Sequence, residues 1–180
     1  MDTNTLEFTP LQSKIFRLIC IKAGSKLNQR EIARTLKATP SGVAKALIDL
    51  EQSELLTIEK NNNMNLNYIS LNRNQRIMRF KQIENIKQIY ELELIEYLEE
   101  KCPGTTIILF GSYSKGEDTL KSDIDIAIIG TKSKNINMEK FERKLERIIN
   151  INYYTSFKDI DKELKENLFN GIVLSGAITL

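Results

Sequence analysis

The stretch from Ile107 to Gly130, IILFGSYSKGEDTLKSDIDIAIIG, constrains the fold of this chain more than any other part. It opens with an apolar run, Ile107 to Phe110, and closes with another, Ile124 to Ile129, a pattern that predicts two buried strands. Between them come Gly111, Ser112, Ser114 and Gly116. A turn of glycines and hydroxyl side chains between two strands is a candidate phosphate-binding site, because its backbone amides can converge on one anion.

Two aspartates accompany the second apolar run: Asp123 directly precedes it and Asp125 lies within it. Side chains alternate along a strand, so these two carboxylates share one face with their Cα atoms roughly 6.6 Å apart, while Ile124, Ile126 and Ile128 share the other. Two carboxylates held side by side repel each other, and a divalent cation removes that repulsion. Oxygen ligands suit Mg²⁺ or Mn²⁺, so the stretch predicts a metal site beside the phosphate site.

Gly111-Ser112, ten intervening residues and Asp123-x-Asp125 resemble the signature of the nucleotidyltransferase superfamily that includes DNA polymerase beta. The nearest resemblance is to the small prokaryotic minimal nucleotidyltransferases, and it covers roughly residues 100–180. It implies that a nucleoside triphosphate, such as ATP, lies against the turn. The expected nucleotide-binding residues are Gly111, Ser112, Gly116 and Ser122.

The same resemblance implies that Asp123 and Asp125 hold Mg²⁺ while an acceptor hydroxyl attacks the α-phosphate and pyrophosphate leaves. Active members of the superfamily place a third carboxylate on the next strand, and the matching position within INYYTSF is Asn152, whose face Asn150 shares. An amide cannot accept the proton of the attacking hydroxyl. Asp159 and Asp161 could replace the missing carboxylate only if the chain folds back.

Composition limits the remaining chemistry. The chain contains no histidine, which excludes imidazole catalysis and disfavours a zinc site. Cys20 and Cys102 are expected to be reduced thiols of a cytoplasmic protein. The net charge of +2 includes no strongly basic segment, so charge alone does not predict nucleic-acid binding. No apolar run approaches the ~20 residues of a membrane span, and we expect no membrane partner.

The N-terminal part predicts three helices and a hairpin. Residues 10–23 begin at Thr9-Pro10, a short helix follows Asn28, and a third runs from Thr39-Pro40 to Leu50. Two alternating runs, 55–59 and 66–71, flank a tip at residues 60–63. This pattern resembles the winged helix-turn-helix of prokaryotic regulators.

The winged-helix resemblance implies binding to double-stranded DNA. Ser41, Gly42 and Lys45 would face the major groove, and Arg34, Lys37 and Lys60 would contact phosphates. A winged helix can instead mediate protein contacts, and that alternative stays open because the module is not strongly basic. Glu54 stands where many relatives place a glycine at the helix end.

Residues 73–100 predict a long helical connection, either one helix or two, with one apolar stripe through Ile77, Ile83 and Tyr90 and a second through Ile89, Leu92 and Ile95. The two stripes suggest burial on two sides, against a domain or a second subunit. After the aspartate strand, a helix over 138–149, a strand over 149–155, a helix from 160 to 170 and a short apolar tail complete the chain. The predicted fold class is α+β: a winged helix-turn-helix over 1–72, a connecting helix over 73–100 and a small mixed-sheet nucleotidyltransferase domain over 101–180.

Two functions remain open at this point. One is a metal-dependent transfer of a nucleoside monophosphate to a hydroxyl, for example on a small helical partner protein. The other is a DNA-binding transcriptional regulator whose transferase domain senses nucleotide and is catalytically weakened. By analogy with winged-helix regulators, we expect a homodimer in either case.

Overall fold

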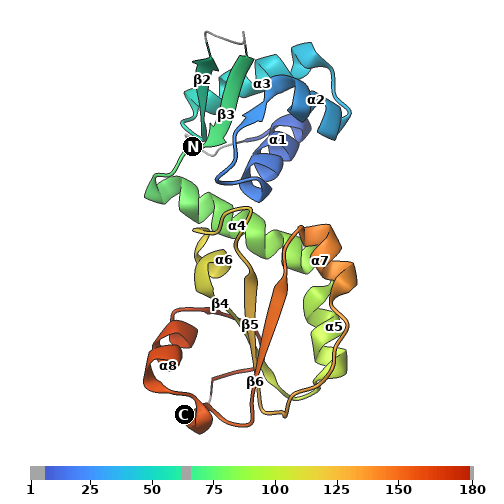
Figure 1. The fold of residues 1–180 in the computed structure, drawn as a ribbon, viewed down its shortest axis with the longest axis vertical. Coiled ribbons are helices and arrows are strands. Elements are labelled where there is room, and N and C mark those ends of the chain that lie inside the picture. Colours follow the sequence, from blue (N-terminus) through green and yellow to red (C-terminus); the bar gives the residue numbers. More distant parts are fainter. Residues whose placement is uncertain (1–6, 62–65, 179–180) are drawn as a thin grey trace, which may run out of the picture. The chain divides into compact units, whose positions relative to one another are not determined.

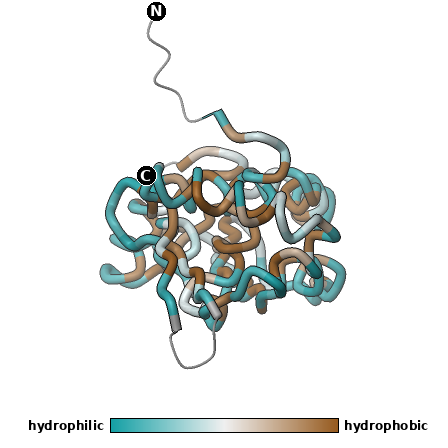
Figure 2. The backbone as a smooth tube through the Cα atoms, turned by 90° about the horizontal axis from the view of Figure 1, so that it is seen from above, coloured by the Kyte–Doolittle hydropathy of each residue, from teal (hydrophilic) through white to brown (hydrophobic). Residues whose placement is uncertain are grey.

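A computed structural model describes residues 7–61 and 66–178 of the chain. The chain divides into two compact units, Met1–Ile77 and Met78–Leu180. Figure 2 shows hydrophobic stretches alternating with hydrophilic ones along the backbone. Within the described residues, none of the helices combines the length and the apolar character needed to cross a membrane.

The first unit contains three helices and a three-stranded antiparallel sheet (Figure 1). In chain order these are α1 (Pro10–Ile21), β1 (Leu27–Asn28), α2 (Gln29–Leu36), α3 (Pro40–Gln52), β2 (Leu56–Asn61) and β3 (Leu66–Leu71). The strand order is β1-β3-β2, with the hairpin register running from Leu56 opposite Leu71 to Asn61 opposite Leu66. This is the topology of a winged helix-turn-helix, which confirms the predicted fold. Asn62 and Asn63 of the predicted tip lie outside the described residues.

Local sequence explains where the helices of this unit begin. The side chains of Thr9 and Asn28 accept hydrogen bonds from the amides of Gln12 and Glu31, whose own side chains bind the cap amides in return. Thr39 caps α3 from one side only, by accepting from the amide of Gly42. Such caps satisfy amides that have no partner inside the helix. The core between the helices is apolar and includes Ile15, Ile19, Ile32, Val43, Leu47 and Leu50.

The second unit is a four-stranded mixed sheet with helices on both faces. Its elements are α4 (Gln75–Glu91, which starts in the first unit), α5 (Leu94–Lys101), β4 (Thr106–Phe110), α6 (Gly111–Lys115), β5 (Ile124–Ile129), α7 (Glu139–Leu145), β6 (Ile149–Tyr154), a 3₁₀ turn (Phe157–Asp159), α8 (Lys162–Phe169) and β7 (Ile172–Ser175). The strand order is β6-β5-β4-β7; β5 and β6 are parallel and the other pairs antiparallel. The mixed sheet and the α+β class agree with the prediction.

The two faces of this sheet have different cores. Ile124, Ile126 and Ile128 pack with residues of α5 and α7 on one face. On the other face, Ala127 and Ile129 pack with Phe157 of the 3₁₀ turn, with Ile160 directly after it and with Leu168 of α8. Figure 1 shows α8 on the side of the sheet opposite α5. Because side chains alternate, Asp125 points to the face that α8 partly covers.

Of the two alternatives for residues 73–100, one helix or two, the structure has two helices, and only part of each predicted apolar stripe is buried. Glu93 adopts a left-handed conformation (φ +57°) between α4 and α5. Ile83 and Tyr90 of the first predicted stripe are 57% and 50% exposed. The second predicted stripe is partly confirmed, since Ile89 and Ile95 are buried. The face of α4 that is buried in their place carries Lys81, Asn85 and Gln88.

The helix predicted over 138–149 ends earlier than expected. α7 stops at Leu145 because Glu146 adopts a left-handed conformation (φ +53°). As a result Ile148, predicted to face inward, is 61% exposed, while the side chain of Arg147 is buried. The tail does form a strand, β7, which pairs with β4.

Candidate nucleotide and metal site

The end of β4 brings the glycine–serine turn against the aspartate strand. Gly111 follows β4 directly with φ +75°, and a Cβ atom at this position would lie 2.6 Å from Oδ2 of Asp125. A side chain at position 111 would therefore collide with the carboxylate as well as strain the backbone. Gly111 also begins α6, and the first amides of a helix have no acceptor inside it. The turn thus offers donors directly beside the Asp125 carboxylate.

Asp123, Asp125 and Asn150 form one polar cluster on neighbouring strands. In the parallel pair β5–β6, Asp125 lies opposite Asn150. The Asn150 Nδ2 atom donates to Oδ2 of Asp123 at 3.2 Å and to Oδ1 of Asp125 at 3.3 Å. Ionised carboxylates only accept hydrogen bonds, so the amide must present its NH₂ group to both. The Asn150 amide is therefore where a third metal-binding carboxylate would stand.

This geometry corrects the predicted third position. Asn152 lies opposite Ala127, one side-chain repeat further along β6 and away from the aspartates. It shares the face of Asn150, as expected, but Asn150 is the residue in contact. Asp159 and Asp161 do not replace the carboxylate either: across residues 7–61 and 66–178, there is no group of three or more Asp, Glu, Cys or His side chains that could hold a metal ion.

Two other predicted nucleotide-binding residues have structural contacts. Gly116 is in a left-handed conformation (φ +72°), and a Cβ atom there would lie 2.1 Å from the carbonyl oxygen of Met78 in α4. Ser122 accepts a hydrogen bond from the amide of Thr119 at 3.0 Å and so closes the loop before Asp123. Gly116 is packed against α4 and is not open to a ligand, which corrects its predicted role.

Sequence reasoning missed a buried ionic cluster next to the turn. The carboxylate of Asp118, a loop residue between α6 and β5, pairs with Lys81 of α4 and lies 3.5 Å from Nη2 of Arg147. Asn85 donates to the same carboxylate at 2.7 Å. All four side chains are at least 95% buried. The available signal was weak: Lys81 and Asn85 lie one helical turn apart, but α4 carries many other polar residues.

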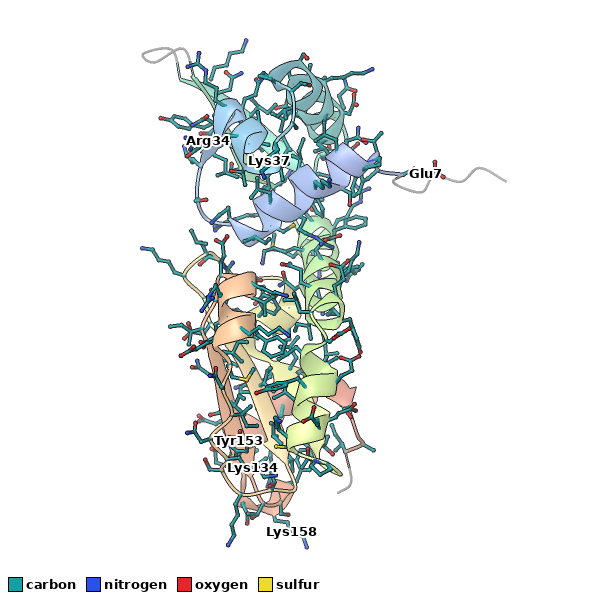
Figure 3. The ribbon with its side chains drawn as sticks, turned by 90° about the vertical axis from the view of Figure 1, so that its right-hand side faces the viewer. Glu7, Arg34, Lys37, Lys134, Tyr153 and Lys158 are labelled. Carbon is teal, nitrogen blue, oxygen red and sulfur yellow. The ribbon has the colours of Figure 1, made fainter. Side chains whose placement is uncertain are left out.

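The residues predicted to contact DNA lie on the surface of the first unit. Ser41 and Lys45 are exposed on α3, and Lys60 is exposed on β2. Arg34 and Lys37, both exposed at the end of α2, are labelled in Figure 3. Lys37 is the left-handed cap of α2 (φ +51°), and the short turn after it leads into α3.

Several solved structures are similar to this chain at low sequence identity. A zinc-responsive MarR family member, Lactococcus lactis ZitR, is 21% identical with a TM-score of 0.43 over 57% of this chain. The adhesin competence repressor AdcR from Streptococcus pyogenes is 19% identical with a TM-score of 0.42 over 53%. An S. aureus MepR–DNA complex is 22% identical with a TM-score of 0.43 over 53%. The chain spans 66% to 70% of the length of such structures.

Among curated proteins, no sequence matches this chain. The family model described as "Polymerase beta, Nucleotidyltransferase" matches residues 92–178, which contain the glycine–serine turn, both aspartates and Asn150. This match agrees with the mixed sheet and with the motif that the sheet presents. The similarity to this nucleotidyltransferase family therefore lies in residues 92–178, which include the whole four-stranded mixed sheet.

Proposed function

We propose that the C-terminal domain binds a nucleoside triphosphate together with a divalent cation, and that its transferase activity is weak. The observation that carries this proposal is the Asn150 amide, which contacts both aspartates where a third carboxylate would stand. In this reading the protein is a minimal nucleotidyltransferase relative that senses nucleotide, joined to a winged helix that binds double-stranded DNA.

The donor set fits a hard divalent cation, since Asp123 and Asp125 offer carboxylate oxygens and the described chain has no histidine or thiolate there. Mg²⁺ or Mn²⁺ would neutralise phosphate charge when bound. The protein itself would bind the terminal phosphates through the Gly111 and Ser112 amides and the Ser112 hydroxyl. Asn150 would steady the two carboxylates, and its amide has no means of taking the acceptor proton.

Titration calorimetry of the full chain with ATP tests the binding part. We expect binding in the presence of Mg²⁺ and a loss of at least about tenfold in affinity for Asp125→Asn, because a charged ligand to the cation is removed. The matched control is Asp159→Asn, an exposed aspartate hydrogen-bonded to Thr155, which should bind like the wild type. Equal affinities for both variants would reject the site.

Incubation with α-labelled ATP tests the catalytic part. We expect little label on the wild type or on added small helical proteins, and at least about a tenfold gain for Asn150→Asp, which restores a group able to accept a proton. Rapid transfer by the wild type, abolished by Asp123→Asn, would establish the protein as an active nucleotidyltransferase and overturn the proposal of weak turnover.

A gel-shift titration against DNA upstream of the protein's own gene tests the winged helix. Removing the charge of Lys60 should weaken binding to DNA of any sequence. It should also reduce the slope of the logarithm of the DNA-binding constant against the logarithm of the salt concentration by about one, as expected for a phosphate contact. Lys14→Ala, at an exposed position on α1, is the control. Absent or salt-insensitive binding would favour the protein-contact alternative.

In either case we propose that Ile83 and Tyr90, the exposed apolar residues of α4, are covered in a homodimer.

A further inference from the structure

The face of α4 that meets the glycine–serine turn is polar and almost fully buried. Lys81 is 0% exposed and Asn85 is 2% exposed. Burying such groups costs free energy unless each finds a partner, and an unpaired charge costs most. Both side chains find partners in the segment between Tyr113 and Asp118 (Figure 1 shows α4 beside α6).

Two amide side chains of α4 bind the backbone of the turn. Gln82 Nε2 donates to the carbonyl of Ser114 at 2.7 Å, and Asn85 Nδ2 donates to the carbonyl of Tyr113 at 2.9 Å. These carbonyls belong to the last turn of α6, where carbonyls need partners outside the helix. Gly116 allows this approach, because any Cβ atom there would meet the Met78 carbonyl. The helix therefore holds α6 by its backbone.

The third attachment is the buried carboxylate of Asp118, which joins three segments. Lys81 and Asn85 bind it from α4, and Arg147 approaches it from the turn after α7. The chain leads from Asp118 to Asp123, and from Arg147 to Asn150. The segments that deliver the metal-binding cluster are thus fixed to each other, and to α4, through one carboxylate.

We propose that Lys81, Gln82 and Asn85 are positioning residues for the nucleotide site, acting through α6 and Asp118. They contact neither phosphate nor cation; they hold the turn and the Asp123 loop in the arrangement that binds. A site ordered in advance loses less conformational entropy on binding, so releasing it lowers affinity. This inference rests on the proposed nucleotide binding. Its test includes one measurement, hydrogen exchange, that does not depend on nucleotide binding.

The mildest test is Gln82→Met, which keeps the length of a half-buried helical side chain and removes its bond to the Ser114 carbonyl. The matched control is Lys87→Met on the exposed face of α4, where Lys87 pairs with Glu91 at 3.9 Å. Two quantities are measured on the full chain: ATP affinity with Mg²⁺, and hydrogen exchange of the amides of residues 111–118.

For Gln82→Met we expect about fivefold to tenfold weaker binding, corresponding to the loss of one hydrogen bond worth about 1 kcal/mol. We also expect faster exchange in residues 111–118, with the rest of the unit unchanged. Lys87→Met should alter neither quantity. Wild-type affinity and wild-type exchange in Gln82→Met would overturn the inference.

A second variant separates positioning from mere stability. Lys81→Met, Asp118→Leu and Arg147→Met together replace the ionic cluster by apolar side chains, an exchange that often preserves stability. We expect a folded protein whose residues 111–118 exchange faster and whose ATP affinity falls at least about tenfold, since the specific links to α4 are gone. Protection and affinity equal to the wild type would overturn the inference. If the wild type itself fails to bind ATP, the proposed function falls, while the exchange data still decide whether α4 positions the turn.

Discussion

The side chains of asparagine and aspartate have the same shape but differ in charge. At position 150 this difference should change the stability of the protein, because Asp123 and Asp125 lie beside the side chain. We predict that Asn150→Asp lowers stability without metal by about 1–2 kcal/mol, because three carboxylates repel one another. For a chain of this length the melting temperature should fall by about 2–8 °C. Millimolar Mg²⁺ should restore it, since a cation binds the native cluster and not the unfolded chain.

Asn152→Asp is the matched control for this melting experiment. Residue 152 lies opposite Ala127 on the same strand face, so its carboxylate should not depend on Mg²⁺. A Mg²⁺ response in Asn152→Asp, or none in Asn150→Asp, would show that the cluster is assigned to the wrong residue.

The confusion of Asn152 with Asn150 has a physical origin. Both residues lie on one face of the strand, so alternation along the sequence cannot separate them. What separates them is the register of the parallel pair β5–β6, and that depends on where α7 ends. The left-handed Glu146 that ends α7 carries no glycine or asparagine signal. The two aspartates and Gly111, by contrast, could be proposed as site residues from the sequence, because their residue types and spacing define the motif without any knowledge of the strand register.

Glu54 illustrates a residue whose backbone suits glycine better. It has φ +59°, and its own amide and carbonyl are both hydrogen-bonded, to the Glu51 carbonyl and the Asn72 side chain. We predict that Glu54→Gly raises the free energy of unfolding by about 0.5–1 kcal/mol, because glycine adopts positive φ without steric cost. Chemical denaturation measures this change. Glu54→Ala, which removes the same side chain but keeps Cβ, should show no such gain; an equal gain would assign the effect to charge.

At the scale of elements, α4 shows most clearly what a hydrophobic pattern can and cannot predict. Ile77 and Ile89 are buried within the protein, Ile83 and Tyr90 are exposed and free to meet a second subunit, and the pattern left Lys81 and Asn85 unassigned. Periodicity assumes that the buried face is the apolar one. Here the buried face of α4 lies against the Asp118 carboxylate and the carbonyls of Tyr113 and Ser114, which need hydrogen-bond donors, so this face carries polar side chains. The longer strands and α8 follow the assumption and were predicted, whereas the two-residue strand β1 was not.

The close packing of α4 on α6 gives a matched pair of glycine substitutions. Gly104 and Gly116 have nearly equal φ angles, +73° and +72°, but a Cβ atom at Gly104 meets nothing within 4 Å. We predict that Gly104→Ala costs about 1 kcal/mol from the backbone alone. Gly116→Ala should cost at least about 3 kcal/mol, because the added methyl also pushes against the α4 backbone. Equal losses of unfolding free energy would mean that α4 does not pack on Gly116.

At the scale of the whole molecule, three boundaries can be drawn for the C-terminal domain. The sequence suggested residue 101, the family model begins at residue 92, and the compact unit begins at Met78. The difference lies in α4, which contributes Lys81, Gln82 and Asn85 to the second unit. The family model begins directly after α4. The contribution of α4 to the domain is a set of buried polar contacts, which no short sequence motif predicts.

These boundaries predict different behaviour for two fragments. A fragment of residues 73–180 keeps all of α4 and should melt cooperatively. A fragment of residues 92–180 leaves the buried Asp118 without Lys81 and Asn85, and breaking such a pair costs about 3–5 kcal/mol. That loss is comparable to the ~5–15 kcal/mol that stabilises a whole domain, so the shorter fragment should be largely unfolded or melt far lower. Circular dichroism measures both. Restoring the shorter fragment by Asp118→Leu would identify the carboxylate as the cause, whereas equal melting of the two original fragments would place α4 outside the domain.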